Sequence, residues 1–414
     1  MKTILCVSHV VPWPGAHGNE IRLQRLLVWL RKQRFRIILV ITATDVEAER
    51  IALMRRHVDR LELPCQSTRS LDAGRLLDRL RHGIGTLRSW LASGGIPPER
   101  GPMQTLADAV CPDRVGRLVR RLEKEEPVDI YLAYYGFALR AFSHVACRER
   151  VVCDTVEAFS MVRHDAAGKP TDRVLSFSSP EEREMLLASG HIMAIQRAEA
   201  EYLAQLVPER PVRTVGLDCD VPPHPGLPSE AAEVIGVVGS ANQANVDGLR
   251  LFLDRSWPLI RARVPRARLR IAGGLGAAAR ELGGSTAPAG METTGWVADI
   301  AEFYRGVRLV VNPVQIGTGL KIKTVEALAH CRPVVTYAIG CEGIEPGAAE
   351  GLCVVDEASA MAEACATLLL DPARCDQMAL AAGGFASAAL SADSIYAPLR
   401  GLLDAIRGGR RSAR

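Results

Sequence analysis

Two hydrophobic patterns alternate along the chain, and their alternation predicts its secondary structure. Short, almost continuous apolar runs are typical of strands buried on both faces of a parallel sheet. Segments with apolar residues at helical spacing separate them, the first from Asn19 to Gln33. In the first half the apolar runs are ILCVSHV, RIILVITA, DIYLAYYG, VVCDTV and HIMAIQ. We therefore expect repeated βαβ units and a parallel sheet covered by helices.

A proline-rich stretch, VPPHPGLPSE at 221–230, interrupts this pattern and is typical of a linker. The pattern restarts with VIGVVGS, ARLRIAGG, RLVVNPV, RPVVTYA and LCVVD, and after Ser359 the chain reads as helical to about Ile406, with a basic tail. The predicted organisation is an N-terminal domain at 1–220, a linker at 221–230, a second domain at 231–390, and a C-terminal helix and tail at 391–414. The expected fold class is α/β, with two Rossmann-like, doubly wound domains facing each other across a crevice.

The length of 414 residues also favours two domains, because one hydrophobic core rarely grows so large. No apolar run approaches the roughly 20 residues that span a bilayer. The start, MKTILCVSHVVPWPG, reads as a first strand and not as a secretion signal, so a cytoplasmic protein is expected. Its 11 cysteines lack C-x-x-C spacing and its 9 histidines lack ligand spacing, so we expect reduced thiols and no metal. No cofactor is expected.

Positive charge is concentrated in the first part of the chain. Residues 1–150 carry 25 Lys and Arg against 16 Asp and Glu, whereas residues 151–414 carry 26 against 31. Basic residues cluster in and after the first predicted helix (Arg22, Arg25, Arg31, Lys32, Arg34 and Arg36) and again at 69–88. Such a face could meet the inner surface of an anionic membrane or an anionic acceptor, or it could be an ordinary solvated surface. Nucleic acid is not expected, because no binding motif is present.

The segment VVNPVQIGTGLKIKTVEALAHCRPVVT, at 310–336, predicts an anion site. Gly317 and Gly319 let the backbone approach an anion closely, and a helix begins behind them at about Leu320. The unpaired N–H groups and positive dipole of that helix end stabilise a diphosphate. Helical spacing places Lys323 and Glu326 on one face, where the alternative is a weak, exposed ion pair.

The turn after the first predicted strand carries weaker evidence. Gly15 and Gly18 precede the first helix, but G-x-x-G occurs in many such turns. No G-x-G-x-x-G follows the strand, which argues against a dinucleotide-dependent dehydrogenase.

Taken together, these segments resemble the family 4 glycosyltransferases of the GT-B fold (glycosyl transferases group 1). VVGSANQANVDGLRLFLDRSWPLI, ARLRIAGG, TTGWVADIAEFYRGVRLVVNP and GTGLKIKTVEALAHCRPVVT are similar to donor-domain segments in the family's order. SHVVPWPGAHGNEIRLQRL, VVCDTVEAFSMVRH and HIMAIQRAEAEYL resemble its acceptor-domain segments. The resemblance implies transfer of a sugar from a nucleotide diphosphate sugar to an acceptor hydroxyl, with retention and without a metal.

The resemblance also implies roles for single residues. Glu326 matches the glutamate that binds the ribose hydroxyls, and Lys323, with Lys321 nearby, falls where the diphosphate is contacted and its developing charge stabilised. The remaining assigned positions lie in the glycine loop (Gly317, Thr318, Gly319 and Leu320), in the segment whose backbone reads the base (Trp296 and Val297), and in the first-domain loop near the diphosphate (Gly18).

Several positions depart from the family pattern. Thr318 replaces an acid that holds the donor sugar in many members, so the sugar must be held differently. Ser240 and Asn245 lie in the stretch where many members carry an Arg and a Lys, and we assign both to donor binding. Val156 replaces a histidine of several relatives; beside it, Glu157 is either an acceptor-side residue or a structural carboxylate.

The predicted function is therefore a retaining, metal-independent glycosyltransferase that uses a UDP- or GDP-sugar in cell-surface polysaccharide or glycolipid synthesis. Its predicted partners are the donor, a saccharide or lipid-linked acceptor, and the inner face of an anionic membrane as a peripheral contact. A catalytically impaired nucleotide-sugar-binding partner is the alternative, and a nucleotide-sugar epimerase is a second.

Overall fold

The computed structural model describes residues 1–15, 17–65, 102–161, 177–220, 233–282, 288–297, 299–316, 319–344 and 350–409. They form two compact units. Unit 1 comprises the described parts of Met1–Val162, Arg173–Val215 and Pro398–Arg414, and unit 2 the described parts of Gly216–Ala397. The basic segment expected at 69–88 lies outside the described residues.

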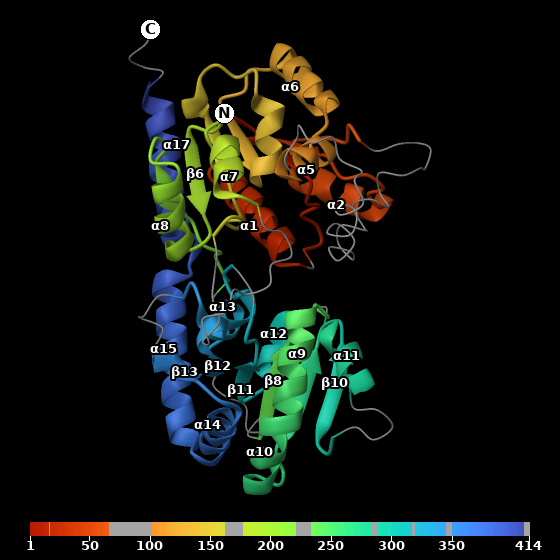
Figure 1. Cartoon of the computed structure of the whole chain (residues 1–414), viewed down its shortest axis with the longest axis vertical. Helices are drawn as coiled ribbons and strands as arrows, with labels where there is room; N and C mark the ends of the chain where they lie inside the picture. The colour runs from red at the N-terminus through yellow and green to blue at the C-terminus, as the bar shows by residue number, and fades with distance from the viewer. Residues whose placement is uncertain are drawn as a thin grey trace. The chain divides into compact units, whose positions relative to one another are not determined.

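Unit 1 is built on a seven-stranded parallel sheet of order β3-β2-β1-β4-β5-β6-β7. Figure 1 labels its strand β6 and its α-helices. Its strands are β1 (Thr3–Ser8), β2 (Arg36–Ile41), β3 (Arg60–Glu62), β4 (Ile130–Tyr134), β5 (Val151–Asp154), β6 (His191–Ala194) and β7 (Val212–Thr214). Its α-helices are α1 (Gly18–Lys32), α2 (Ala48–His57), α5 (Pro102–Val110), α6 (Asp113–Glu125), α7 (Ser179–Leu186), α8 (Arg197–Leu206) and α17 (Ala397–Gly409, with Ala397 counted in unit 2). The short 3-10 helices η1 (Gly136–Phe142) and η2 (Arg148–Arg150) lie between β4 and β5 in the chain.

Unit 2 is built on a six-stranded parallel sheet of order β10-β9-β8-β11-β12-β13. Its strands are β8 (Val234–Val238), β9 (Arg268–Ala272), β10 (Met291–Gly295), β11 (Leu309–Asn312), β12 (Val334–Tyr337) and β13 (Leu352–Val355). Its helices are α9 (Gln243–Leu251), the π-helical η4 (Phe252–Ser256), α10 (Trp257–Arg263), α11 (Leu275–Leu282), α12 (Ile300–Arg305), α13 (Ile322–Ala329), the 3-10 helix η5 (Ala338–Cys341), α14 (Ala358–Leu370), α15 (Pro372–Ala389) and α16 (Ala392–Ile395).

Both sheets reverse their strand order beside their first strand, at β1/β4 in unit 1 and at β8/β11 in unit 2. Doubly wound sheets bind ligands outside the carboxyl ends of the strands at such a switch point. The predicted α/β class is confirmed, and the ten quoted apolar runs contain, apart from the first residue of β1, the strands β1, β2, β4, β5, β6, β8, β9, β11, β12 and β13.

The three strands that the hydrophobic pattern did not indicate are β3 (RLE), β7 (VRT) and β10 (METTG). Each lies at a sheet edge, where one side pairs with no strand of that sheet. Polar residues are tolerated there, so the apolar signal of a central strand is missing.

The apolar faces of the strands and helices form the cores of the units. In unit 1, Leu5, Ile38, Tyr131 and Cys153 share one buried cluster. All eleven cysteines are free thiols, as expected. Over the residues that the structure describes, no helix is long and apolar enough to cross a bilayer.

Candidate functional site

The predicted anion turn lies at the switch point of unit 2. Strand β11 ends at Asn312, and α13 begins at Ile322, two residues later than the pattern indicated. Gly319 has φ +73°, a conformation that glycine adopts without a steric cost. Gly317 and Thr318 lie outside the described residues, so their assigned roles stay predictions.

Lys323, in the first turn of α13, is tied to the loop that follows β8. Its Nζ donates a hydrogen bond to Oδ1 of Asn245 in α9. The Asn245 side-chain amide donates in turn to the Ser240 carbonyl oxygen (2.8 Å) and more weakly to the Ser240 hydroxyl (3.3 Å). A Cβ at Gly239 would lie 2.9 Å from both Cε and Nζ of Lys323, so a side chain at this position would displace the end of the Lys323 side chain. Three of the assigned donor residues, Ser240, Asn245 and Lys323, therefore form one hydrogen-bonded group.

The environment of Lys323 lowers the pKa of its ammonium group. Burial is the main cause, the like charge of Lys321 adds to it, and the opposite charge of Glu326 partly offsets both, so the pKa of Lys323 falls to about 8. Lys321 itself donates to the Gly319 carbonyl oxygen (3.0 Å) and lies 3.6 Å from the Glu342 carboxylate. An anion placed here would meet two lysines that repel each other in its absence.

Glu326 lies one turn further along α13, beside the buried ring of Tyr304. The Tyr304 hydroxyl interacts with the Glu326 carboxylate, and burial together with that negative charge raises the pKa of Tyr304 well above its usual value. His330 stacks on the Tyr304 ring at 4.7 Å between centroids. Lys323 bonds across to α9, and Glu326 is supported by α12. The pair is therefore part of a packed site and not an isolated, exposed ion pair.

A buried polar cluster fixes α13 against the sheet. The Asn312 side-chain amide donates to the Thr324 hydroxyl (3.0 Å), and that hydroxyl donates to the Gly340 carbonyl oxygen (2.6 Å). The Thr336 hydroxyl donates to the Asn312 carbonyl oxygen (2.8 Å). Because each side chain is fully or almost fully buried, an unmade bond here would be costly. The start of α13 is thus held in register with the ends of β11 and β12.

The carboxyl ends of β8, β9 and β10 meet through glycines. The Gly273 N–H donates to the Gly295 carbonyl oxygen (2.6 Å), and a Cβ at Gly273 would lie 2.5 Å from the Gly239 carbonyl oxygen. Trp296 follows Gly295 directly and is 67% exposed, whereas Val297 packs against a buried cluster that includes Phe303. Leu320 packs against a second buried cluster with Val325. The backbone before the predicted nucleobase-binding segment is therefore closely packed, and the Trp296 side chain is exposed to solvent.

In unit 1, the predicted residues Gly18 and Glu157 lie at the carboxyl end of the sheet. Gly18 is the first residue of α1. Glu157 follows β5. Burial is the main cause of the raised pKa of Tyr135, and the negative charge of Glu157 raises it further. Gly18 and Glu157 both belong to unit 1, and their assigned roles remain predictions.

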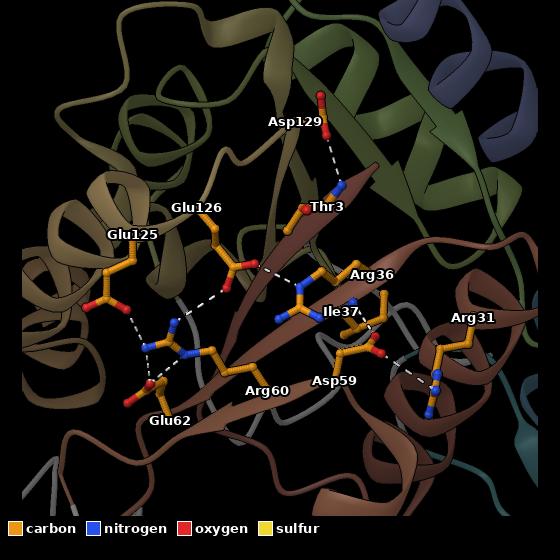
Figure 2. A network of polar contacts seen from close by, with 10 residues as sticks. All are labelled: Thr3, Arg31, Arg36, Ile37, Asp59, Arg60, Glu62, Glu125, Glu126 and Asp129. Carbon is orange, nitrogen blue, oxygen red and sulfur yellow. Dashed lines mark hydrogen bonds and ion pairs between the residues drawn. The ribbon is translucent and has the colours of Figure 1, made fainter. Parts of the chain in front are cut away.

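The basic cluster of the first helix is not one exposed face. Arg22 is buried and makes a two-pronged ion pair with Asp154 at 3.0 and 3.1 Å. Arg36 pairs with Glu126 (2.8 Å), and Arg31 lies 3.7 Å from Asp59 (Figure 2). Sequence reasoning did not pair Arg22 with Asp154, because the two residues lie 132 positions apart. The aspartate that ends the apolar run VVCD was a signal that could have pointed to a buried charge.

No group of three or more His, Cys, Asp or Glu that could hold a metal ion occurs among the described residues. The polar groups around α13 are hydrogen-bond donors that can bind an anion, together with the carboxylate of Glu326. This set is suited to a nucleoside diphosphate.

Comparisons with known proteins concern the family of unit 2 and the fold of the chain. Residues 232–371 match the family model described as Glycosyl transferases group 1. The fold matches Anabaena Alr3699/HepE, solved with UDP and glucose, at TM-score 0.65 and 15% identity over 98% of this chain and 100% of that one. It also matches sucrose-phosphate synthase from Thermosynechococcus elongatus (TM-score 0.66, 15% identity, 99% and 100% covered). WaaG, a glycosyltransferase involved in lipopolysaccharide biosynthesis, matches at TM-score 0.55 and 13% identity over 97% and 98%. A search of curated proteins returned no match.

At these identities the solved structures show the fold, which is GT-B. The family model covers the part of unit 2 that holds Ser240, Asn245, Trp296, Lys323 and Glu326. The chain therefore has the GT-B fold, and residues 232–371 in unit 2 match the group 1 glycosyltransferase family model. The resemblance on which the sequence prediction rested is confirmed.

Proposed function

We propose that the chain is a retaining, metal-independent glycosyltransferase that takes its sugar from a nucleoside diphosphate sugar. The observation that carries this proposal is the group formed by Lys323, Asn245 and Ser240, with Glu326 one turn further along α13. It gathers a cation and hydrogen-bond groups at the switch point of unit 2, where a doubly wound sheet binds its ligand. The UDP in the similar Anabaena structure supports a uridine nucleotide as the donor.

In this mechanism the residues of unit 2 hold the nucleotide and stabilise its departure. Lys323, Lys321 and the first turn of α13 stabilise the negative charge that develops on the diphosphate as the bond from phosphate oxygen to sugar breaks. The leaving oxygen takes the proton of the acceptor hydroxyl, so no protein nucleophile is needed. Glu326 accepts hydrogen bonds from the ribose hydroxyls, and Trp296 and Val297 lie at the base.

Thermal-shift measurements with UDP, GDP, ADP and their sugars test the donor site. We expect Glu326→Ala to remove the nucleotide-induced rise in Tm, and Lys323→Ala to weaken diphosphates more than the free nucleoside. Glu302→Ala is a matched control, because Glu302 is exposed on the neighbouring helix α12. If both site variants respond like the wild type, the donor site lies elsewhere.

Slow donor hydrolysis distinguishes an enzyme from the alternative, a catalytically impaired binding partner. The absence of an Arg and a Lys from the stretch that holds Ser240 and Asn245, together with Thr318, motivates that alternative. Sugar release from one donor of the panel supports the enzyme, and nucleotide binding without release from any donor supports the binding partner.

We also propose an anionic membrane surface as a peripheral partner of unit 1, in polysaccharide or glycolipid synthesis at the inner face of the membrane.

The charge distribution on helix α6 supports this membrane contact. Its apolar residues Val115, Val119 and Leu122 are buried. Glu123 is engaged by Tyr131 and His144, and Glu125 by Arg60. Its outward side is basic, with Arg114, Arg117, Arg120, Arg121 and Lys124 exposed. Sedimentation with phosphatidylglycerol vesicles at low salt tests this contact, and protein remaining in the supernatant contradicts it.

A further inference from the structure

The side chain of Tyr304 in α12 is completely buried, yet its hydroxyl lies beside a charged group of the candidate site. A buried phenol hydroxyl needs a hydrogen-bond acceptor, because leaving it unpaired costs free energy. Helix α13 offers it two acceptors, the Glu326 carboxylate and the Lys323 carbonyl oxygen. The contact to the carbonyl oxygen is long, at 3.4 Å, and a carboxylate is the stronger acceptor. The Tyr304 hydroxyl therefore donates mainly to Glu326.

Packing fixes the ring that carries this hydroxyl. The His330 ring stacks on the Tyr304 ring, with the centroids 4.7 Å apart and the planes 18° from parallel. Tyr304 also belongs to a buried cluster that includes Ala327 and Leu328, the two residues that follow Glu326 in α13. The hydroxyl and the carboxylate are therefore held in one relative position by contacts between α12 and α13.

A buried arginine fixes the backbone of the same residue. Arg332, two residues before β12, is fully buried, and its Nε donates to the Tyr304 carbonyl oxygen at 2.6 Å. Burying a guanidinium is costly, and burial lowers the pKa of Arg332 to about 10. Tyr304 is thus held at its ring by α13 and at its backbone by the segment that leads into β12.

The Glu326 side chain, in contrast, is only half-buried, so it meets Tyr304 and also the surface of α13. A carboxylate can accept hydrogen bonds at about four lone-pair positions, and the Tyr304 hydroxyl occupies one of them. Because that bond is anchored in the core, it sets the direction in which the other positions point. Two adjacent hydroxyls, such as those of a ribose, are the donors that suit an oriented carboxylate.

We propose that Tyr304 is a positioning residue that makes the site selective for ribonucleotides over 2′-deoxyribonucleotides. It touches no substrate and acts by orienting the Glu326 carboxylate toward the two ribose hydroxyls. This inference rests on the proposed function, in which Glu326 accepts those hydrogen bonds. An oriented carboxylate loses a partner when the 2′-hydroxyl is missing, and such a site rejects the ligand that lacks the hydroxyl. A carboxylate free to turn would follow the remaining hydroxyl and discriminate less.

Calorimetric affinities for UDP, GDP and ADP, each measured beside its 2′-deoxy form, test the proposal. We expect the wild type to bind the preferred ribonucleotide at least about tenfold more tightly than its 2′-deoxy form, since a hydrogen bond to a charged group is lost. Tyr304→Phe removes the hydroxyl and keeps the ring, and should reduce this ratio to about threefold or less. Glu326→Gln should reduce it equally. Combining both changes should reduce it no further, because they act on one interaction.

Tyr396→Phe is the matched control. The Tyr396 hydroxyl is another buried donor to a carboxylate in unit 2, that of Asp218 at 2.7 Å. This variant should keep the wild-type ratio, whatever its Tm, because a loss of stability alone does not favour one sugar over the other.

Three results overturn the proposal: a wild type that binds a nucleotide without discriminating, a Tyr304→Phe or Glu326→Gln protein that keeps the wild-type ratio, and a Tyr396→Phe protein that loses the ratio as Tyr304→Phe does. A wild type that binds none of the three ribonucleotides contradicts the proposed function itself.

Discussion

At the scale of single residues, environment decides what each charge does. Lys323 and Arg22 are both basic residues within helices, yet one is a lysine with a lowered pKa and the other a buried ion-pair partner. Helical spacing alone placed Lys323 and Glu326 on one side of α13. It could not indicate Asn245, because that partner is 78 positions away along the chain.

The pKa of Lys323, about 8, predicts how UDP binding depends on pH. A bound diphosphate favours the charged lysine, so binding takes up a proton once the pH exceeds about 8. Affinity for UDP should therefore fall as the pH rises from 7 to 9.5, by at most about tenfold per pH unit. Titration calorimetry measures this.

The control for that pH dependence is Lys323→Arg, which stays charged throughout this range. Its affinity for UDP should vary less between pH 8 and pH 9.5 than that of the wild type. Equal slopes for the two proteins would mean that a different group titrates.

At the scale of elements, contacts with β11, β12 and η5 fix the position of the first turn of α13. A Cβ at Gly340 would lie 1.9 Å from the Thr336 hydroxyl and 3.1 Å from the Asn312 amide. Gly340→Ala should therefore cost about 1–3 kcal/mol of unfolding free energy, the range for overpacking, and should also weaken UDP. Urea denaturation measures the first and calorimetry the second.

Gly384→Ala in α15 is the matched substitution, since nothing lies within 4 Å of the added Cβ. Alanine in a helix interior is favoured over glycine by about 0.5–1 kcal/mol, so this variant should be as stable as the wild type or more so. A Gly340→Ala protein of unchanged stability would show that the cluster adapts.

The basic side of α6 gives the second prediction at this scale. Each cation near an anionic surface contributes about 1 kcal/mol, so reversing Arg117, Arg120 and Lys124 to Glu should weaken vesicle binding by about two orders of magnitude or more. Vesicle sedimentation measures the change. Reversing the exposed Arg250, Arg255 and Arg266 of unit 2 changes the net charge equally. If both triple variants lose the same affinity, net charge and not α6 is responsible.

At the scale of the whole molecule, the two ends of the chain meet in unit 1. Most of α17 belongs to unit 1, although it follows unit 2 in the sequence. Leu399, Leu402 and Leu403 are buried, and the Arg400 guanidinium lies 5.9 Å from the centre of the Trp29 ring in α1. Unit 1 is therefore completed only after unit 2 has been made.

Removing residues 398–414 should destabilise unit 1. Three buried leucines are worth about 1.5–3 kcal/mol each, so the loss amounts to several kcal/mol. Hydrogen exchange should accelerate in α1, while exchange in α13 and its protection by UDP stay as in the full chain. Faster exchange spread equally over α13 would show that the two units do not unfold separately.

The sequence by itself determined the parallel α/β architecture, the central strands and the helix α13 behind the glycine-rich segment, in which it predicts an anion site. Those features rest on local patterns: apolar runs, glycine positions and helical spacing. Resemblance to a family, and not spacing, supplied the roles of Glu326 and Glu157. Only the tertiary structure decided that Asn245 holds Lys323, that Arg22 is buried against Asp154, and that α17 joins unit 1. These are pairings between distant segments, and their energies depend on burial and on the partners that folding brings together.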